Sequence, residues 1–228
     1  MNENKIQLLG HYGSDEIHAC SAWTSTSREM SDEKKTRIPK LLKMLAEQGH
    51  HTPFEKSGLH FLVTSEIASH IHLLKHRIGV SINGESARYK ELKEDKFFLP
   101  NDWKGIRADN GNVEHPDHQN FIHFGEDWVN VLANYTDLGN TLYHKCVKDL
   151  EPTLGRKRAK ESARFFKTYN SQIDCDIMFN WRSFYHFLNL RNKEASQKEI
   201  REIAAEMLAL VKAIEGNPFE HTIAAFDL

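Results

Sequence analysis

Residues 75–89 read KHRIGVSINGESARY, and they directly follow a predicted amphipathic helix. The stretch contains three cationic side chains, Lys75, Arg77 and Arg88, together with two serines, an asparagine and a glutamate. Guanidinium groups match phosphate oxygens in a fork geometry, so such a cluster suits an anionic ligand. Runs of charge are, however, more often solvated surface. From this stretch alone, a surface loop and a phosphate site remain alternatives.

The segments on either side of this stretch predict an α+β fold. Ser65 can cap a helix that begins at Glu66, in which Ile67, Ile71 and Leu74 form an apolar stripe. Strands are expected over residues 4–9, 58–65 and 168–179. Helices are expected over residues 38–48, 66–77, 117–149, 154–166, 180–191 and 195–214, and residues 93–118 read as loop. No linker or repeat divides the chain, which predicts one domain over residues 1–228.

Composition limits the classes of function. The 228 residues carry 30 lysines and arginines against 32 aspartates and glutamates, so a general nucleic-acid-binding coat is not expected. No stretch approaches the roughly 18 apolar residues that span a bilayer, and no secretory signal pattern is present at the start. Three cysteines far apart in sequence fit a reduced compartment. We therefore expect a cytoplasmic protein without nucleic-acid or membrane partners.

Two arginines stand beside apolar residues. Arg191 continues the spacing of Phe184, Phe187 and Leu188, where the apolar face of a helix should extend. A buried guanidinium needs an anionic or hydrogen-bonding partner, and either a protein carboxylate or a ligand would serve. Arg164 precedes two phenylalanines and is expected to point inward, whereas the basic residues at 156–160 read as a solvated face.

Fourteen histidines raise the alternative of a metal site. His72 and His76 have the i, i+4 spacing of a ligand pair, but no acidic ligand stands beside them and no HExxH motif is present. Zinc needs three or four ligands, so satisfied or exposed histidines are favoured over a metal site.

The stretches GHHTPFE at 49–55, KHRIGVSINGESARY at 75–89 and NWRSFYHFLNLRNKEASQKEIR at 180–201, in this order, resemble the flavin-dependent thymidylate synthases. KHRIGVSINGESARY is similar to that family's RHRxxSxNExSxRY signature, and GHHTPFE at 49–55 is similar to its GHxTPFE. NWRSFYHFLNLRNKEASQKEIR at 180–201 is similar to its NxRSLxxFLxLRxxxxAQxEIR. Arg164 lies sixteen residues before Asn180, the spacing at which the family carries a phosphate-binding arginine. The resemblance spans about residues 20–210.

The resemblance implies a fold, a reaction and an assembly. The fold is α+β, with a mixed central sheet and long flanking helices. The reaction is the transfer of a methylene group from 5,10-methylenetetrahydrofolate to C5 of dUMP, with FAD as cofactor and NADPH as reductant, to give dTMP. The assembly is a homotetramer with shared active sites. No cysteine nucleophile is used in this family, in keeping with cysteines that lie outside any nucleophile setting here.

The resemblance also assigns residues to the cofactor and to the substrate. The FAD-binding residues implied are Thr52, Glu55, Lys75, His76, Arg77, Asn83, Glu85, Asn180, Arg182 and His186. The dUMP-binding residues implied are His72, Lys75, Gly84, Glu85, Ser86, Ala87, Arg88, Arg164 and Arg191. Arg88 and Arg164 would clamp the phosphate. Arg191 would be the catalytic residue, because a cation at N3 and O2 of uracil makes C5 a better nucleophile. No metal is implied.

The chain departs from the family signature at four positions. Lys75 replaces an arginine and loses the fork geometry, and His72 replaces a glutamine. One residue is inserted before Ser86, and Gly84 stands where the family has glutamate, with Glu85 one step later. We expect Glu85 to take the place of the missing carboxylate.

These departures keep other functions open. A related flavin enzyme could modify another pyrimidine nucleotide, for instance by hydroxymethylation, and the mass of the product would identify it. A non-catalytic nucleotide-binding relative would bind dUMP without FAD. A histidine-metal hydrolase would lose activity on chelation of its metal.

Overall fold

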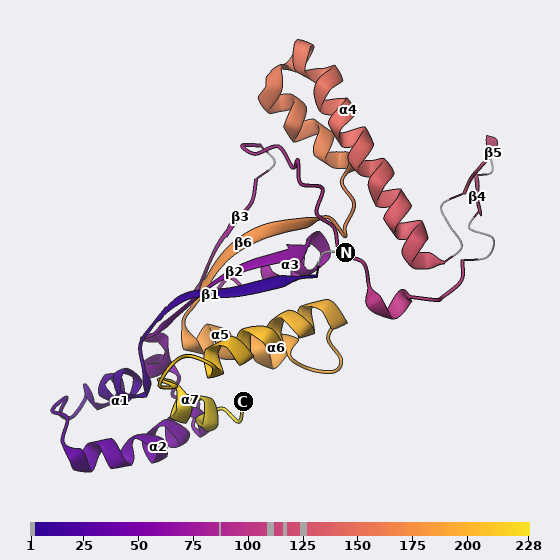
Figure 1. The fold of residues 1–228 in the computed structure, drawn as a ribbon. Coiled ribbons are helices and arrows are strands. Elements are labelled where there is room, and N and C mark those ends of the chain that lie inside the picture. The colour runs from indigo at the N-terminus through magenta and orange to yellow at the C-terminus, as the bar shows by residue number, and fades with distance from the viewer. Residues whose placement is uncertain (1–2, 87, 109–111, 116–117, 124–126) are drawn as a thin grey trace. The chain divides into compact units, whose positions relative to one another are not determined.

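The computed structural model describes residues 3–86, 88–108, 112–115, 118–123 and 127–228, whose elements are labelled in Figure 1. The strands are β1 (Lys5–Tyr12), β2 (Gly58–Glu66), β3 (Val80–Gly84), β4 (Asn112–His115), β5 (His118–His123) and β6 (Gln172–Phe179). The α-helices are α1 (Asp15–Trp23), α2 (Asp32–Glu47), α3 (Ile67–Leu73), α4 (Trp128–Ala163), α5 (Trp181–Arg191), α6 (Lys198–Lys212) and α7 (Glu220–Ala225). Short 3₁₀ turns cover Thr52–Glu55, Asn101–Trp103 and Arg164–Phe166.

Four strands form one sheet in the order β1-β2-β6-β3. The Glu85 N–H donates to the Asp174 carbonyl, and the Asn180 N–H donates to the Gly79 carbonyl, so β3 and β6 run in opposite directions. The sheet is antiparallel, which confirms the α+β class and corrects the mixed sheet that was expected. The reason is the position of β6, which lies between β2 and β3 although it is far downstream in sequence. Strands β2 and β3 run in the same direction, and β6 separates them, so they do not pair with each other.

Contacts within the chain divide it into two compact units. The first unit comprises residues 64–70 and 84–174 with the N-terminal residues to Asn4, and the second comprises residues 5–63, 71–83 and 175–228. The larger hydrophobic core belongs to the second unit and includes the fully buried Trp181, Phe54 and Phe184. A small cluster around Tyr143 and Val147 belongs to the first unit. The expectation of one domain over residues 1–228 stays a prediction.

Several helix bounds differ from those expected. Helix α2 begins at Asp32 rather than at residue 38, because the Ser31 hydroxyl caps it by accepting the Lys34 N–H at 3.3 Å. Helix α4 begins at Trp128, after the Asp127 cap, because β5 occupies part of the expected helix 117–149. It then continues to Ala163 through a kink at Gly155.

The apolar stripe expected on α3 is wrong. Ile71 is 38 % exposed and Leu74 is 44 % exposed, whereas Leu73 and Ser69 are fully buried. Helix α3 has only 7 residues, so it makes too few turns for a long periodic face to form. Among the described helices, none is long and apolar enough to cross a membrane.

Candidate active site

The end of helix α5 brings Arg191 to His76, which follows helix α3. The Arg191 Nε donates to His76 Nε2 at 3.1 Å, so the proton of this neutral imidazole lies on Nδ1. The His76 ring also packs edge-on against Phe187, with ring centroids 5.0 Å apart, and lies 6.1 Å from the ring of His186. Burial lowers the pKa of His76 to about 4, and the positive charge of Arg191 acts in the same direction.

Arg191 is therefore oriented by a neutral acceptor. The sequence left open whether Arg191 pairs with a protein carboxylate or with a ligand. Within the described ranges Arg191 forms no ion pair, so its partner there is not a protein carboxylate. The guanidinium is half-buried and keeps its full positive charge for another group. A guanidinium whose charge is not compensated by a carboxylate is expected at a site that binds an anion or a ring on which negative charge develops.

The start of helix α5 is joined closely to the turn after α3. The Asn180 side chain caps α5 by accepting the Ser183 N–H at 2.9 Å, and the Ser183 hydroxyl donates to the Ile78 carbonyl at 2.8 Å. Gly79 has a φ of +68°, and a Cβ there would lie 2.3 Å from Ser183 Oγ. Only glycine fits this approach, so the turn holds the cationic stretch against the N-terminus of α5.

Glu55 and Arg182 connect the 3₁₀ turn Thr52–Glu55 to helix α5. The Arg182 guanidinium donates to the Glu55 carboxylate, and Arg182 remains largely exposed. Thr52 is exposed at the start of the same turn. Two segments of the sequence resemblance, far apart in the chain, are thereby joined within the second unit.

Lys75 and Arg77 lie just beyond helix α3 and are exposed. Neither forms an ion pair with any residue that the structure describes. His72 is half-buried and Asn83 is exposed on β3. The second unit thus contains every residue expected at FAD except Glu85.

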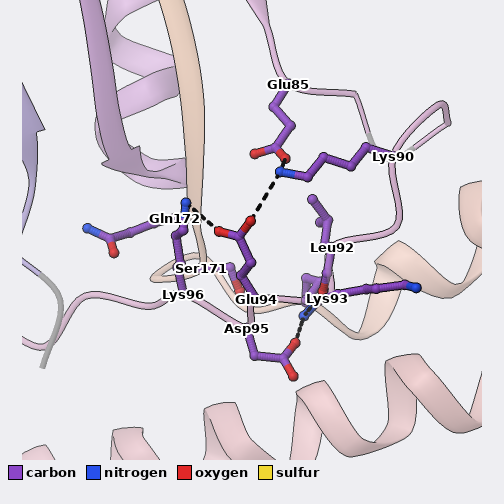
Figure 2. Close-up of a pocket in the computed structure, with 10 residues that line it drawn as sticks. Glu85, Lys90, Leu92, Lys93, Glu94, Asp95, Lys96, Ser171 and Gln172 are labelled. Carbon is purple, nitrogen blue, oxygen red and sulfur yellow. Dashed lines mark hydrogen bonds and ion pairs between the residues drawn. The ribbon is translucent and has the colours of Figure 1, made fainter.

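Glu85 belongs to the first unit, and protein groups hold both of its carboxylate oxygens. Oε1 lies 2.8 Å from the ammonium of Lys90, and Oε2 accepts the Asp174 N–H at 3.3 Å. Figure 2 shows the Glu85 carboxylate and the Lys90 ammonium pointing toward each other. The hydrogen bond to Glu85 is the largest cause of the raised pKa of Lys90. Glu85 therefore fixes the loop after β3, and its expected ligand role stays a prediction.

A pocket in the first unit lies beside Glu85 and is lined by charges of both signs (Figure 2). Glu94 bridges two lysines: its carboxylate lies 2.6 Å from Lys96 Nζ and 3.5 Å from Lys90 Nζ. The Lys167 ammonium is almost fully buried and is held by Asp95 and by Asn140 Oδ1. Carboxylates pair with three of the four lysines that line this pocket, so most of its positive charge is compensated, unlike that of a phosphate site.

Gly84 lies close to the ring of His70. A Cβ at Gly84 would lie 3.2 Å from Cε1 of His70, a residue that is 8 % exposed. A side chain at position 84 would therefore make a tight contact with this ring, which would have to shift by a few tenths of an ångström.

The remaining residues expected at the phosphate are not all brought together in the described part of the chain. The Ser86 hydroxyl accepts the Arg88 N–H at 3.3 Å, and Arg88 Nε lies 2.7 Å from Glu161 Oε1. Arg164 is exposed rather than pointing inward, because the preceding Ala163 takes the buried position where α4 ends. Ala87 lies outside the described residues.

Sequence reasoning missed three residues that shape the site: Gly79, Ser183 and His70. The signal for Gly79 was present, because a glycine between a polar loop and a strand often marks a positive φ. The role of Ser183 and of His70 depends on contacts between distant segments, which no local pattern reveals. Among the described residues, no group of three histidine, cysteine or acidic side chains could hold a metal ion.

Comparison with known proteins gives a consistent family. The family described as thymidylate synthase complementing protein matches residues 7–215. A flavin-dependent thymidylate synthase of Rickettsia bellii is 30 % identical over 91 % of this chain and 71 % of its own. A second, of Pseudothermotoga lettingae, is 29 % identical over 92 % of this chain and 85 % of its own. The solved structure of a UMP/dUMP methylase, PolB, from Streptomyces cacaoi bound with 5-Br dUMP has the same fold, with a TM-score of 0.76 at 24 % identity over 99 % of this chain and 95 % of that chain.

Proposed function

The chain belongs to the thymidylate synthase complementing protein family, the flavin-dependent thymidylate synthases, and on that premise we propose that it converts dUMP to dTMP by reductive methylation. The relatives that match it almost throughout carry that activity in their names. The observation that supports the proposal most directly is the environment of Arg191. Its guanidinium is oriented by a neutral His76 and has no carboxylate partner in the described part of the chain.

The donor set of the second unit fits a planar, anionic cofactor such as FAD. Lys75 and Arg77 are exposed cations without ion pairs among the described residues, as a pyrophosphate requires. The Gly79 turn leaves no room for a side chain between this stretch and α5. Thr52, Asn180, Arg182 and His186 would hold the cofactor, whose bound flavin would supply the hydride that reduces the transferred carbon to a methyl group.

The protein's own contribution is positioning and electrostatics. Arg191 would bind the uracil ring at N3 and O2 and stabilise the negative charge that develops when C5 attacks. His76 would keep the Arg191 guanidinium in one orientation through its Nε2. Because its pKa of about 4 keeps His76 neutral near pH 7, the imidazole accepts this hydrogen bond throughout the physiological range.

Other parts of the proposed function rest on the family resemblance. We propose NADPH as the reductant, 5,10-methylenetetrahydrofolate as the methylene donor and a homotetramer as the working assembly. We also infer a cytoplasmic setting. Glu85, Ser86, Arg88 and Arg164 are proposed to bind the nucleotide side of dUMP, and Arg88 would then exchange its contact with Glu161 for the phosphate.

The test is a flavin titration followed by a turnover assay. Purified protein incubated with FAD and desalted should retain about one flavin per subunit, read from its visible absorption. With NADPH and 5,10-methylenetetrahydrofolate it should then raise the mass of dUMP by one CH2, because a methyl group replaces the hydrogen at C5. UMP and dCMP as competing substrates would reveal a different pyrimidine preference, and a hydroxymethyl product mass would identify the alternative reaction. A protein that binds dUMP but no FAD would contradict the proposal.

Replacing Arg88 or Arg164 with alanine is expected to weaken dUMP binding. Each loss of a charge-assisted phosphate contact should cost about 1.5–3 kcal/mol, which is roughly a tenfold to hundredfold rise in Kd. Isothermal titration with dUMP measures this. Arg158→Ala is the matched control, because Arg158 is an exposed cation near Glu161 on the same helix and has no assigned role. An unchanged Kd for Arg88→Ala or Arg164→Ala would remove that residue from the clamp.

A further inference from the structure

The C-terminal helix α7 lies outside the matched family region, which ends at residue 215. It nevertheless contacts the elements that carry the flavin-side residues. Helix α7 packs against α1 and α2, and α1 packs in turn against the 3₁₀ turn Thr52–Glu55. All these elements belong to the second unit. The segment after residue 215 is therefore connected to the proposed cofactor site by direct packing.

Phe226, which follows α7, is the residue that makes this connection. Its ring lies 4.8 Å from the ring of Phe54, 5.3 Å from that of His51 and 4.3 Å from that of Tyr185, measured between centroids. Phe54 is fully buried and Phe226 is 8 % exposed. These four rings form an aromatic cluster, which we define as His51, Phe54, Tyr185 and Phe226.

The aromatic cluster joins the two elements that the Glu55–Arg182 ion pair also joins. Phe54 lies inside the turn Thr52–Glu55, and Tyr185 lies on α5 between Arg182 and His186. The Glu55–Arg182 pair is partly exposed and is worth little by itself. The buried aromatic contacts are the stronger restraint on the spacing between the turn and α5.

Helix α7 is itself held firmly in place by a buried carboxylate. Asp15 on α1 accepts the backbone N–H groups of His221 and Thr222, both at 2.8 Å, and also accepts the Thr222 hydroxyl. The Thr222 oxygen in turn lies 3.0 Å from Nδ1 of the buried His18. Burial raises the pKa of Asp15 and lowers that of His18 to about 4. This network fixes the direction in which the chain reaches Phe226.

We propose that Phe226 is a positioning residue for the proposed cofactor site. It acts through Phe54 and Tyr185, setting the distance between the turn that carries Thr52 and Glu55 and the helix that carries Arg182 and His186. This inference rests on the proposed function for the identity of the ligand, but the positioning itself is a property of the protein alone. It assigns a role to a segment that the family match does not include.

The test compares Phe226→Ala with Phe219→Ala. Phe219 is fully buried at the N-cap of α7, where its ring stacks on that of Trp181 with centroids 5.2 Å apart, and it makes no ring contact with Phe54 or Tyr185 among the described residues. Both variants should lower the melting temperature. Only Phe226→Ala should raise the Kd for FAD, by about tenfold in a flavin fluorescence titration, with kcat at saturating FAD changed less than twofold. Phe226→Leu should restore most of the affinity.

Amide hydrogen exchange gives a readout that needs no cofactor. Exchange at residues 51–56 should accelerate in Phe226→Ala relative to the unchanged protein and not in Phe219→Ala. Equal effects of both variants on FAD affinity and exchange, or no effect of Phe226→Ala on either, would overturn the positioning role. If Phe226→Ala does not fold, the same comparison is made with Phe226→Leu, for which a smaller rise of about twofold to threefold is expected. Failure of the unchanged protein to bind FAD would instead refute the proposed function, while the exchange result would still decide the positioning of the turn.

Discussion

Arg191→Ala is expected to lower kcat by about 10²–10³-fold, the usual effect of removing one group that stabilises charge in a transition state. The reason lies in the geometry of the guanidinium, which His76 orients at 3.1 Å and no carboxylate neutralises in the described part of the chain. Flavin should stay bound, because Lys75, Arg77 and the start of α5 are unaffected by the change. Steady-state turnover of dUMP, measured beside the flavin content of the same sample, checks both statements.

A second readout separates this electrostatic role from simple disruption. Because the charge of Arg191 helps to lower the pKa of His76, the alanine variant should show a higher His76 pKa by NMR titration. Arg191→Lys keeps the charge but removes the Nε donor, so it should keep the His76 pKa low and recover only part of kcat. Loss of FAD with unchanged dUMP binding in Arg191→Ala would contradict the placement of this residue at the uracil ring.

The elements of the fold that carry a complete local signal were predicted well. Helix α5 begins after the capping Asn180 and buries Phe184, Phe187 and Leu188, as its sequence spacing indicates. Strands β2 and β6 and helix α6 were also predicted, because apolar runs between turn residues or at helical spacing identify them. The α+β class follows from these elements alone.

Other elements required information that lies far away in sequence. The aromatic residues near 121 fit both a helix and the strand β5 (His118–His123), since six residues are too few to distinguish the two periods. A proline in a helix usually stands in its first turn, so the start of α2 was expected at residue 38. The helix begins earlier, at Asp32, after the capping Ser31. The short helix α7 has no periodic face and was not predicted.

The motifs identified candidate site residues but not the partners of those residues. Glu85 was expected at a ligand, yet Lys90 and the backbone of Asp174 hold its carboxylate. Arg88 contacts Glu161, which lies far along the chain on α4. A sequence pattern gives the residue type at each position, whereas the identity of a charge partner depends on how distant elements pack, so these contacts could only come from the structure.

Gly79→Ala is expected to destabilise the protein by about 2–4 kcal/mol, the sum of a left-handed backbone at a non-glycine residue and a disturbed helix cap. The φ of +68° is the first cause, and the new Cβ would lie 2.3 Å from Ser183 Oγ and 2.6 Å from Asn180 Nδ2. Those two side chains hold the start of α5 to the turn after α3. The variant should therefore lose FAD binding as well as stability. The melting temperature should fall by about 5–15 °C for a chain of this size.

Gly216→Ala is the control that isolates the contribution of the backbone. Gly216 has a φ of +72°, close to that of Gly79, but no atom lies within 4 Å of the position its Cβ would take. The control should therefore lose only about 1–2 kcal/mol, the cost of the left-handed conformation, and should bind FAD normally. Chemical denaturation and flavin titration of both variants measure the two costs separately. If both variants lose the same stability and keep FAD, then the close approach of Gly79 to Ser183 does not contribute to the site, and the start of α5 is positioned by its own cap alone.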